Sequence, residues 1–261
     1  MPPDQGVPDT CFPRLTLPPL HASSRLHSAN ADSQTSWRRA DGAAGEWRGG
    51  CATVTEPTET AEIAALRVKA NAGDADAQYN LGVCYNVGHG VPQDSVQGAA
   101  WIRKAAEQGL VGAQFNLGLM YAYGRGVPQD YTQAVAWYRK AAEQGNAIAQ
   151  YNLGDAYYFG QGVPQDYAQA VAWFRKAAEQ GYAHAQNDLA VMYANGQGVP
   201  QDYVESHKWR NLAASRASAE NQKIYAGIRD LVAAEMTLAQ LAEAQKLARE
   251  WLAAFEKRGG K

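Results

Sequence analysis

Four aspartates that recur at a fixed interval are the first candidates for chemistry in this chain. They are Asp94, Asp130, Asp166 and Asp202, and each one ends a Val-Pro-Gln-Asp segment. A carboxylate can act as a general acid or base, or as a metal ligand. Each aspartate, however, stands where a helix is expected to begin and has Gln or Glu three residues later. This pattern predicts a capping box, in which the aspartate accepts a backbone N–H and the Gln or Glu side chain reaches back to another. We therefore interpret the four aspartates as periodic caps rather than as catalytic groups.

The other residue types that carry chemistry are not arranged for it. The sequence has no Ser-x-x-Lys acylation motif, and its Gly-x-Gly segments lack the third glycine and the preceding strand of a dinucleotide site. No histidines are paired for metal binding, and the cysteines Cys11, Cys51 and Cys84 are scattered. His89 is expected in solvent, and His207 at the surface or in cap packing. We predict no catalytic residue, no metal and no cofactor.

The aspartates belong to a longer repeat that must be understood first. The Val-Pro-Gln-Asp segments begin at Val91, Val127, Val163 and Val199, so the period is 36 residues. Tryptophan, leucine and tyrosine recur in the same register, at Trp101, Trp137, Trp173 and Trp209, at Leu81, Leu117, Leu153 and Leu189, and at Tyr85, Tyr121, Tyr157 and Tyr193. A fixed period of this length indicates stacked supersecondary units.

Each unit reads as two helices with a break between them. In the third unit Ala149, Leu153 and Tyr157 are spaced by four residues on one helix face, and Gly160 is placed to end that helix in a left-handed conformation. The proline of the next segment cannot continue a helix interior. A second helix then follows from its aspartate cap, with the tryptophan on its buried stripe.

One helical hairpin cannot cover its own apolar face, so successive hairpins must stack. A buried tryptophan hides roughly 150–250 Å², which predicts that the tryptophans lie between successive units. Small residues at Gly82, Gly118, Gly154 and Ala190 are expected to let neighbouring helices approach closely. The Arg-Lys pairs, such as Arg139-Lys140 and Arg175-Lys176, are expected to stay in solvent.

The period also divides the chain. Residues 1–58 are rich in Pro, Ser, Gly and Ala without a sustained period, and we predict that they are disordered. The segment 59–73 aligns with the second half of a unit, and four units follow at about 74–109, 110–145, 146–181 and 182–216. Residues 217–257 read as two helices that cap the stack, with Thr237 and Gln240 forming a capping box.

The unit resembles the Sel-1-like repeat family, a relative of the tetratricopeptide repeat. In the second unit the resemblance is carried by Leu117, Gly118, Tyr121, Gly124, Gly126, Val127, Asp130, Ala134, Trp137, Lys140, Ala141 and Gly145, and by their counterparts. It covers roughly residues 59–216. It implies an all-α fold, a right-handed α/α superhelix of helical hairpins, and a role as an adaptor that gathers proteins into complexes.

Positions that vary between units point to the site of such a role. Two residues before the core leucine, a side chain lies about 200° away around the helix, so it faces away from the packed stripe. Many residues on this first-helix face are aromatic or apolar. We predict that the face binds a partner protein or peptide through Phe115, Asn116, Leu119, Tyr123, Tyr151, Asn152, Asp155, Tyr158, Phe159 and Val191. The alternative is that these side chains pack against the neighbouring unit.

A polar ladder runs beside this face at Asn80, Asn116, Asn152 and Asp188. It could hold the backbone of a ligand, although a structural bond to the next unit is the favoured reading. The face has no cluster of lysine and arginine, so we expect recognition that is not primarily of an anionic terminus.

The composition narrows the partners further. The net charge of −2 favours neither nucleic acid nor an anionic membrane, and no apolar run reaches the length of a membrane helix. We expect a monomer, and a cytoplasmic one because no signal peptide is evident. A misassigned gene start would leave a periplasmic or secreted location open.

Two other functions remain open at this point. Cysteine-rich relatives have been linked to β-lactam hydrolysis, but those proteins carry a cysteine pair in every repeat, whereas these repeats contain Cys84 alone. A purely architectural or inhibitory subunit, held by the opposite face or by the cap, is the second alternative.

Overall fold

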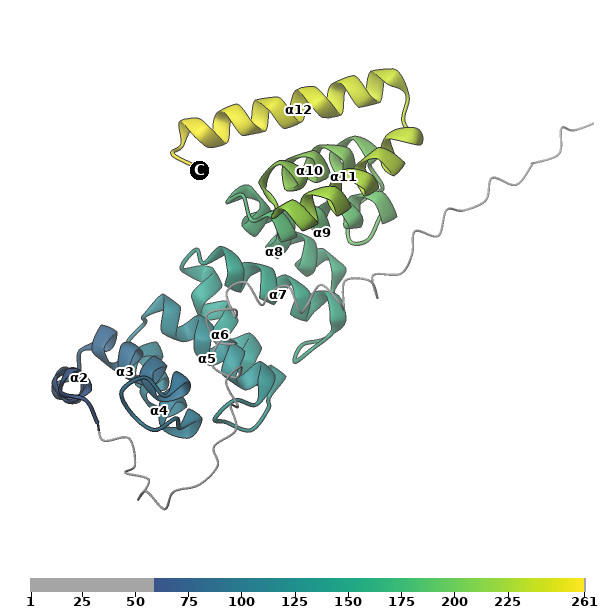
Figure 1. The fold of residues 1–261 in the computed structure, drawn as a ribbon. Helices are drawn as coiled ribbons and strands as arrows, with labels where there is room; N and C mark the ends of the chain where they lie inside the picture. Colours follow the sequence, from purple (N-terminus) through teal and green to yellow (C-terminus); the bar gives the residue numbers. More distant parts are fainter. Residues whose placement is uncertain (1–58, 261) are drawn as a thin grey trace, which may run out of the picture. The chain divides into compact units, whose positions relative to one another are not determined.

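The computed structural model describes residues 59–260, and every regular element in that range is an α-helix. Figure 1 shows these helices in chain order. Their bounds are α2 Ala61–Asn71, α3 Ala75–Val87, α4 Ser95–Glu107, α5 Val111–Tyr123, α6 Tyr131–Glu143, α7 Ala147–Phe159, α8 Tyr167–Glu179, α9 Ala183–Asn195, α10 Tyr203–Arg216, α11 Ala219–Ala234 and α12 Leu238–Lys257. The predicted disorder and two of the three cysteines, Cys11 and Cys51, fall on residues 1–58, outside the described part.

Consecutive helices pack as hairpins, and each hairpin packs on the next. The pairs α3–α4, α5–α6, α7–α8 and α9–α10 form the four units, and α4, α6 and α8 each contact the first helix of the following unit. Helix α2 packs on α3 in the place of a second helix. The predicted fold class, an α-helical solenoid of 36-residue hairpins, is confirmed.

The predicted helix ends are present in all four units. The carboxylates of Asp94, Asp130, Asp166 and Asp202 accept backbone N–H groups in the first turns of α4, α6, α8 and α10. The reciprocal half of a capping box is absent from these four starts, contrary to expectation. The backbone N–H of each aspartate donates instead to the carbonyl of the repeat tyrosine in the first helix, as Asp166 does to Tyr157 at 2.9 Å. Among the helices between residues 59 and 260, only α12 begins with a complete box, formed by Thr237 and Gln240.

The tryptophans lie between units, as predicted. Trp137 packs with Ile102 and alanines of the preceding unit as well as with Leu117 of its own unit, and Trp173 packs in the same way one unit later. Both are buried, whereas Trp101 beside the short α2 is partly exposed. Burying these rings joins each hairpin to its neighbour. The same core residues recur every 36 residues because each unit makes this contact.

Two kinds of glycine allow close approaches. At Gly154 a Cβ atom would lie 2.5 Å from the ring of Phe174, so this glycine seats the aromatic side chain of the second helix. At Gly162, with φ of +74°, a Cβ would overlap the carbonyl group of Tyr131 at the start of α6. The loop of one unit therefore rests directly on the backbone of the unit before it.

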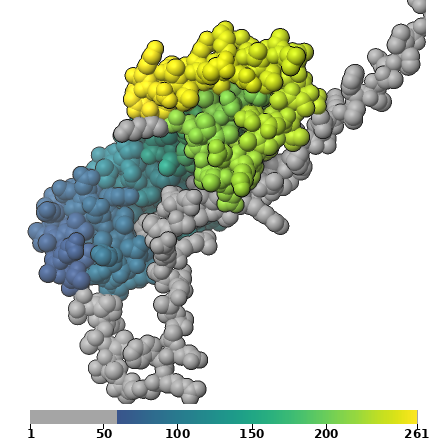
Figure 2. All heavy atoms as spheres, turned by 45° about the horizontal axis from the view of Figure 1, so that its top comes forward, coloured from purple at the N-terminus to yellow at the C-terminus, as the bar shows by residue number. Residues whose placement is uncertain are grey.

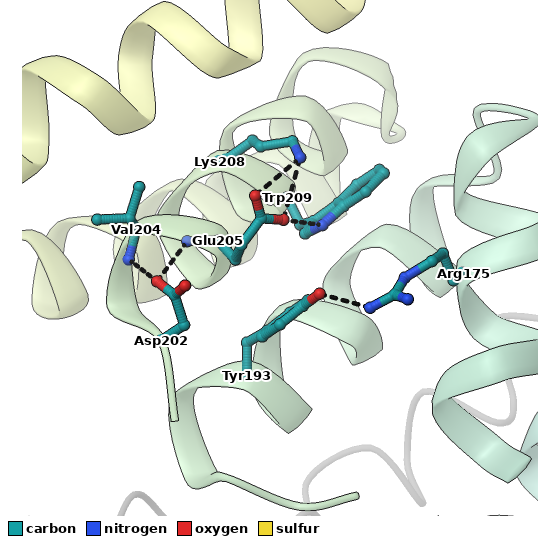
Figure 3. Close-up of polar contacts among 7 residues, drawn as sticks. All are labelled: Arg175, Tyr193, Asp202, Val204, Glu205, Lys208 and Trp209. Atoms are coloured by element: carbon teal, nitrogen blue, oxygen red, sulfur yellow. Dashed lines mark hydrogen bonds and ion pairs between the residues drawn. The ribbon is translucent and has the colours of Figure 1, made fainter. Parts of the chain in front are cut away.

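The Arg-Lys pairs are largely exposed, as predicted, and they also contact aromatic side chains, which was not predicted. Arg139 donates to the Tyr157 hydroxyl of the next unit at 2.7 Å, and Arg175 makes the same bond to Tyr193 (Figure 3). Lys140 places its Nζ 3.9 Å from the centre of the Trp137 ring. The long stems let each charged head stay near the surface while it stacks on or bonds to an aromatic side chain.

Two helices complete the described chain. Both α11 and α12 pack on α10, and Trp251 and Phe255 of α12 stack with ring centres 4.8 Å apart. Much of α12 is open to solvent, as its yellow surface in Figure 2 shows. In the fourth unit, Glu205 accepts bonds from Lys208 and Trp209 (Figure 3).

Candidate interaction surface

The first helices of the first three units end on exposed apolar side chains. The last helical residues are Val87, Tyr123 and Phe159, whose exposed fractions are 37%, 50% and 45%. They recur at the 36-residue period, and the fourth unit has Asn195 in the same place. Each residue precedes a glycine in the left-handed conformation, which ends the helix and leaves its final side chain uncovered.

Around Phe159 the exposed ring belongs to a small aromatic group. The Tyr158 ring centre lies 4.9 Å from that of Phe159 and 5.2 Å from that of Tyr167. Tyr167 is the first residue of α8, and its hydroxyl accepts a bond from Gln165. Two predicted site residues are therefore brought together with a third aromatic side chain from the second helix.

On α5 the predicted residues form a gradient from partly buried to exposed. Phe115 is partly buried, with its ring centre 6.1 Å from that of Tyr138, and Leu119 packs against the same core cluster. Tyr123 lies at the open end, where the Arg125 guanidinium sits 5.7 Å from its ring centre. The exposed anchor on this helix is Tyr123.

Tyr151 packs against the second helix of its own unit and against the next unit. Its ring centre lies 5.6 Å from that of Phe174 and 5.2 Å from that of Tyr182, and its hydroxyl donates to Asp188 at 3.0 Å. The side chain remains partly exposed. A tyrosine held by contacts with the second helix and with the next unit is a poor choice for a binding test, because its removal would also loosen the fold.

Asp155 and Asp188 bring two carboxyls close together beside Tyr151. Burial raises the pKa of Asp155 well above its usual value, and the negative charge of Asp188 raises it further. The other units carry Val83, Leu119 and Val191 at the position of Asp155. The carboxyl is therefore not required for stacking, and its raised pKa favours the neutral form on this face.

The polar ladder makes bonds between units. Asn116 donates to the Tyr79 hydroxyl of the preceding unit at 2.7 Å, and Asp188 accepts the equivalent bond from Tyr151. Asn152 and Val191 are partly buried, and Asn80 is exposed. Asn116 and Asp188 therefore make structural bonds between units, as the favoured interpretation expected. Each bond runs to the preceding unit, whereas a bond to the next unit was expected.

The fourth unit departs from the others in its core. Arg210 replaces the ring that is Tyr138 or Phe174 in earlier units, and it is only 1% exposed. Burial lowers its pKa to about 10, while the negative charge of Asp188 acts against the shift. Within the described part of the chain, its Nε and Nη1 atoms have no hydrogen-bond partner. His207 on the same helix is also buried, and burial lowers its pKa. Of the two positions predicted for His207, the structure shows packing towards the cap and not a surface position.

Sequence reasoning missed the aromatic side chains that the second helices and loops add to this face. These are Tyr131, Tyr167 and Tyr182. Tyr131 is 40% exposed, and its hydroxyl accepts a bond from Gln129. Tyr131 and Tyr167 share one register position, which was a signal available in the repeat.

Chemistry of other kinds finds little support in the described chain. Between residues 59 and 260 no three His, Cys, Asp or Glu side chains are grouped in a way that could hold a metal ion. Over the same range no helix has the length and apolar character needed to cross a bilayer. Cys84 is a free thiol whose pKa is raised by burial.

Comparison with known proteins identifies the family to which this chain belongs. The Sel1 repeat model matches residues 75–110, 111–146, 147–182 and 183–218, which is more than half of the chain. A Sel1 repeat protein from Oxalobacter formigenes is 38% identical over 64% of this chain and 48% of its own, with a TM-score of 0.57. A protective antigen of uropathogenic Escherichia coli with an SLR fold is 29% identical over 75% of this chain and 50% of its own, with a TM-score of 0.47.

This chain spans about half the length of those two solved relatives. An immunity protein from Pseudomonas aeruginosa is 19% identical over 78% of this chain and 84% of its own, with a TM-score of 0.39. No curated protein matches. Proteins with Sel1 repeats are generally non-catalytic scaffolds for protein interactions. The four matched repeats and their hairpin stack place this chain in the Sel1 repeat family.

Proposed function

We propose that this protein is a non-catalytic adaptor that binds a partner protein through the face formed by its first helices. The centre of the site lies on α5 and α7, with Tyr123 and Phe159 as anchors. The observation that carries the proposal is the exposure of apolar side chains at one repeated position, Val87, Tyr123 and Phe159, at the open ends of successive first helices.

The fold itself gives no reason for these side chains. The core leucine, tyrosine and tryptophan recur in every unit, whereas the last position of the first helix changes from valine to tyrosine, phenylalanine and asparagine. A single exposed apolar side chain is common on protein surfaces, so what matters here is the recurrence of such side chains at one position of the repeat. Large aromatic side chains left exposed in a row are typical of sites where another molecule supplies the missing contacts.

The partly buried members of the predicted site have a second role. Phe115, Leu119 and Tyr151 pack against the second helices and so fix the shape of the face. Asn116 and Asp188 hold neighbouring first helices together through tyrosine hydroxyls. Recognition is then assigned to the exposed rings, and preorganisation of the surface to the side chains beneath them.

Affinity capture from the native host tests this function. The bait is the full chain, and the test variant is Tyr123→Ala with Phe159→Ala. The matched control is Val96→Ala, which truncates a side chain that is 68% exposed near the start of the second helix α4. Partners recovered by wild type and control should fall at least tenfold with the double variant, measured by quantitative mass spectrometry.

Two outcomes would count against the adaptor model. Equal recovery of partners by the double variant would favour the alternative of an architectural or inhibitory subunit held elsewhere. Turnover of nitrocefin by the purified protein would favour the hydrolase alternative. Unchanged circular dichroism of both variants is the control for folding.

A further inference from the structure

We propose that α11 is a pH-sensitive cap, which loosens from the fourth unit when the buried His207 gains a proton below about pH 6.5. The junctions between the four repeats do not share this response. Opening of the cap does not depend on which face of the stack binds a partner, and it gives the C-terminal end of the stack a control of its own.

Helix α11 packs as a first helix although it lacks the repeat sequence. In the repeats an arginine of the second helix donates to a tyrosine 18 residues later, as Arg175 does to Tyr193. At the equivalent places one unit further on, Arg229 of α11 donates to Asn211 of α10 at 3.0 Å. The same two places are joined, with the donor and acceptor exchanged, so α11 lies on α10 as the next first helix would (Figure 1).

Few buried side chains hold α11 in this place. The buried residues of this 16-residue helix are Asn221, Tyr225 and Val232. Tyr225 packs against Ala213 and Ala214 of α10. The shorter α9, which is the first helix of a complete unit, buries twice as many of its residues. A single unfavourable charge at the junction with α10 therefore has a large effect on the docking of α11.

The junction contains a histidine where the other junctions have an apolar residue. One, two and three periods before His207 stand Val171, Val135 and Ala99, and all three are buried. His207 is itself only 3% exposed, and its Nδ1 atom has no hydrogen-bond partner among residues 59–260. A neutral imidazole is tolerated in such a place, whereas an imidazolium would bury a charge together with an N–H that lacks an acceptor.

The charged groups around His207 also oppose a proton there. Burial is the main cause that lowers its pKa, and the positive charges of Arg229 on α11 and Arg210 on α10 lower it further. Asp230 of α11 acts in the opposite direction. Its carboxylate, however, lies 2.7 Å from Nη2 of Arg229 and its side chain is 66% exposed, so its effect on His207 is largely offset.

A second histidine touches α11 without creating the same sensitivity. Nδ1 of His184 lies 2.9 Å from the hydroxyl of Tyr225. A tyrosine hydroxyl can donate to a neutral ring nitrogen or accept from a protonated one. This bond therefore survives a change of charge on His184, and the response to pH is assigned to His207.

The direction of the response follows from the pKa of His207. Because the docked state lowers this pKa, the opened state, in which the ring is hydrated, binds the proton more tightly. Docking is fully stable above the ordinary histidine pKa of about 6.5 and weakens as the pH falls below it. Between pH 8 and pH 5 the opened fraction can rise by at most about thirtyfold, the limit for a ring that stays neutral while it is buried.

Hydrogen–deuterium exchange of the full chain, read by mass spectrometry, tests the proposal. Protection factors at pH 8, 7, 6 and 5 are corrected for intrinsic exchange, and α11 is compared with α5 in the same sample. The test variant is His207→Val, which restores the residue of the second and third units. The matched control is His89→Gln, because His89 is exposed in the loop after α3.

We expect the protection of α11 to fall at least about fivefold from pH 8 to pH 5 in wild type and in His89→Gln, with little change in α5. In His207→Val this fall should be absent. The same fall in His207→Val, no fall in wild type, or an equal fall in α5 and α11 would each overturn the proposal. His207→Gln, which is polar but does not titrate, provides the same comparison if the valine variant folds poorly.

Discussion

Replacing Gly162 by alanine should weaken the junction between the second and third units more than any conformational effect alone would. Gly162 has φ of +74° and touches the carbonyl group of Tyr131 in the preceding unit. Gly145 is the matched control, because its φ of +89° is also left-handed but nothing lies within 4 Å of the place for its Cβ. Alanine at Gly145 therefore reports the cost of backbone conformation without the steric overlap.

The magnitude follows from these two contributions. Holding an L-residue in the left-handed region costs about 1–2 kcal/mol. Forcing an extra carbon into a packed contact adds about 1–3 kcal/mol, because the Tyr131 carbonyl belongs to a helix backbone and cannot rotate away. We expect a loss of about 2–5 kcal/mol for Gly162→Ala and about 1–2 kcal/mol for Gly145→Ala.

Urea unfolding followed by tryptophan fluorescence measures the difference. With a slope near 2 kcal/mol/M, the midpoint of Gly162→Ala should fall about 1 M below that of Gly145→Ala. Hydrogen exchange should show the additional opening at the start of α6. Equal midpoints for the two variants would refute the reasoning, since the contact with Tyr131 would then contribute nothing.

Three further predictions concern the stack. Trp137→Ala should cost about 3–5 kcal/mol and broaden the thermal transition, and an unchanged midpoint with a sharp transition would contradict the role of Trp137 between units. Asp188→Asn with Ala190→Gly and Arg210→Phe restores the repeat sequence and should raise the melting temperature, because it removes two unpaired N–H-bearing atoms from the core; a lower value would disprove this. Because the folded-state pKa of Asp155 is raised, the folded state holds its proton more tightly, and stability is lost as pH rises from the unfolded pKa of about 4 through the folded value. Asp155→Asn should therefore melt higher than wild type at pH 7, with a difference that shrinks towards pH 4; a constant difference would argue against the shift.

The hairpin stack could be predicted from sequence because its causes are local and repeated. A proline and an aspartate break the helices at one position in every unit, and the core leucine and tryptophan keep a helical spacing. Stacking then follows from the apolar face that one hairpin leaves open. Capping was predicted only in part, since periodicity does not reveal that the aspartate N–H already bonds the tyrosine carbonyl.

The side-chain roles on the first-helix face were harder to predict. A helical wheel places Tyr151 away from the core, yet its long ring reaches Phe174 and its hydroxyl reaches Asp188. Charge patterning correctly predicts an exposed Arg139, but it does not predict that the guanidinium also donates to Tyr157 of the next unit. Contacts of this kind depend on how units are rotated against one another, which the period alone does not specify.

For α11, repeat matching in the sequence predicted less than the structure shows. The repeat signature ends after Arg216, so sequence matching stops near there, and α11 nevertheless packs as a first helix. Its packing needs only a large residue at Tyr225 facing small residues at Ala213 and Ala214. The packing of α11 therefore resembles that of a first helix although its sequence no longer matches the repeat, because only a few contacts are needed.

Site-specific photo-crosslinking in the native host tests the central claim most directly. A benzophenone amino acid replaces Phe159 in one variant and Val96 in the other, so that exposed positions on the first and second helices are compared. We predict that Phe159 gives a covalent adduct with a partner protein and that Val96 gives none. Adducts at Val96 with none at Phe159 would contradict the claim that the first-helix face is the binding surface.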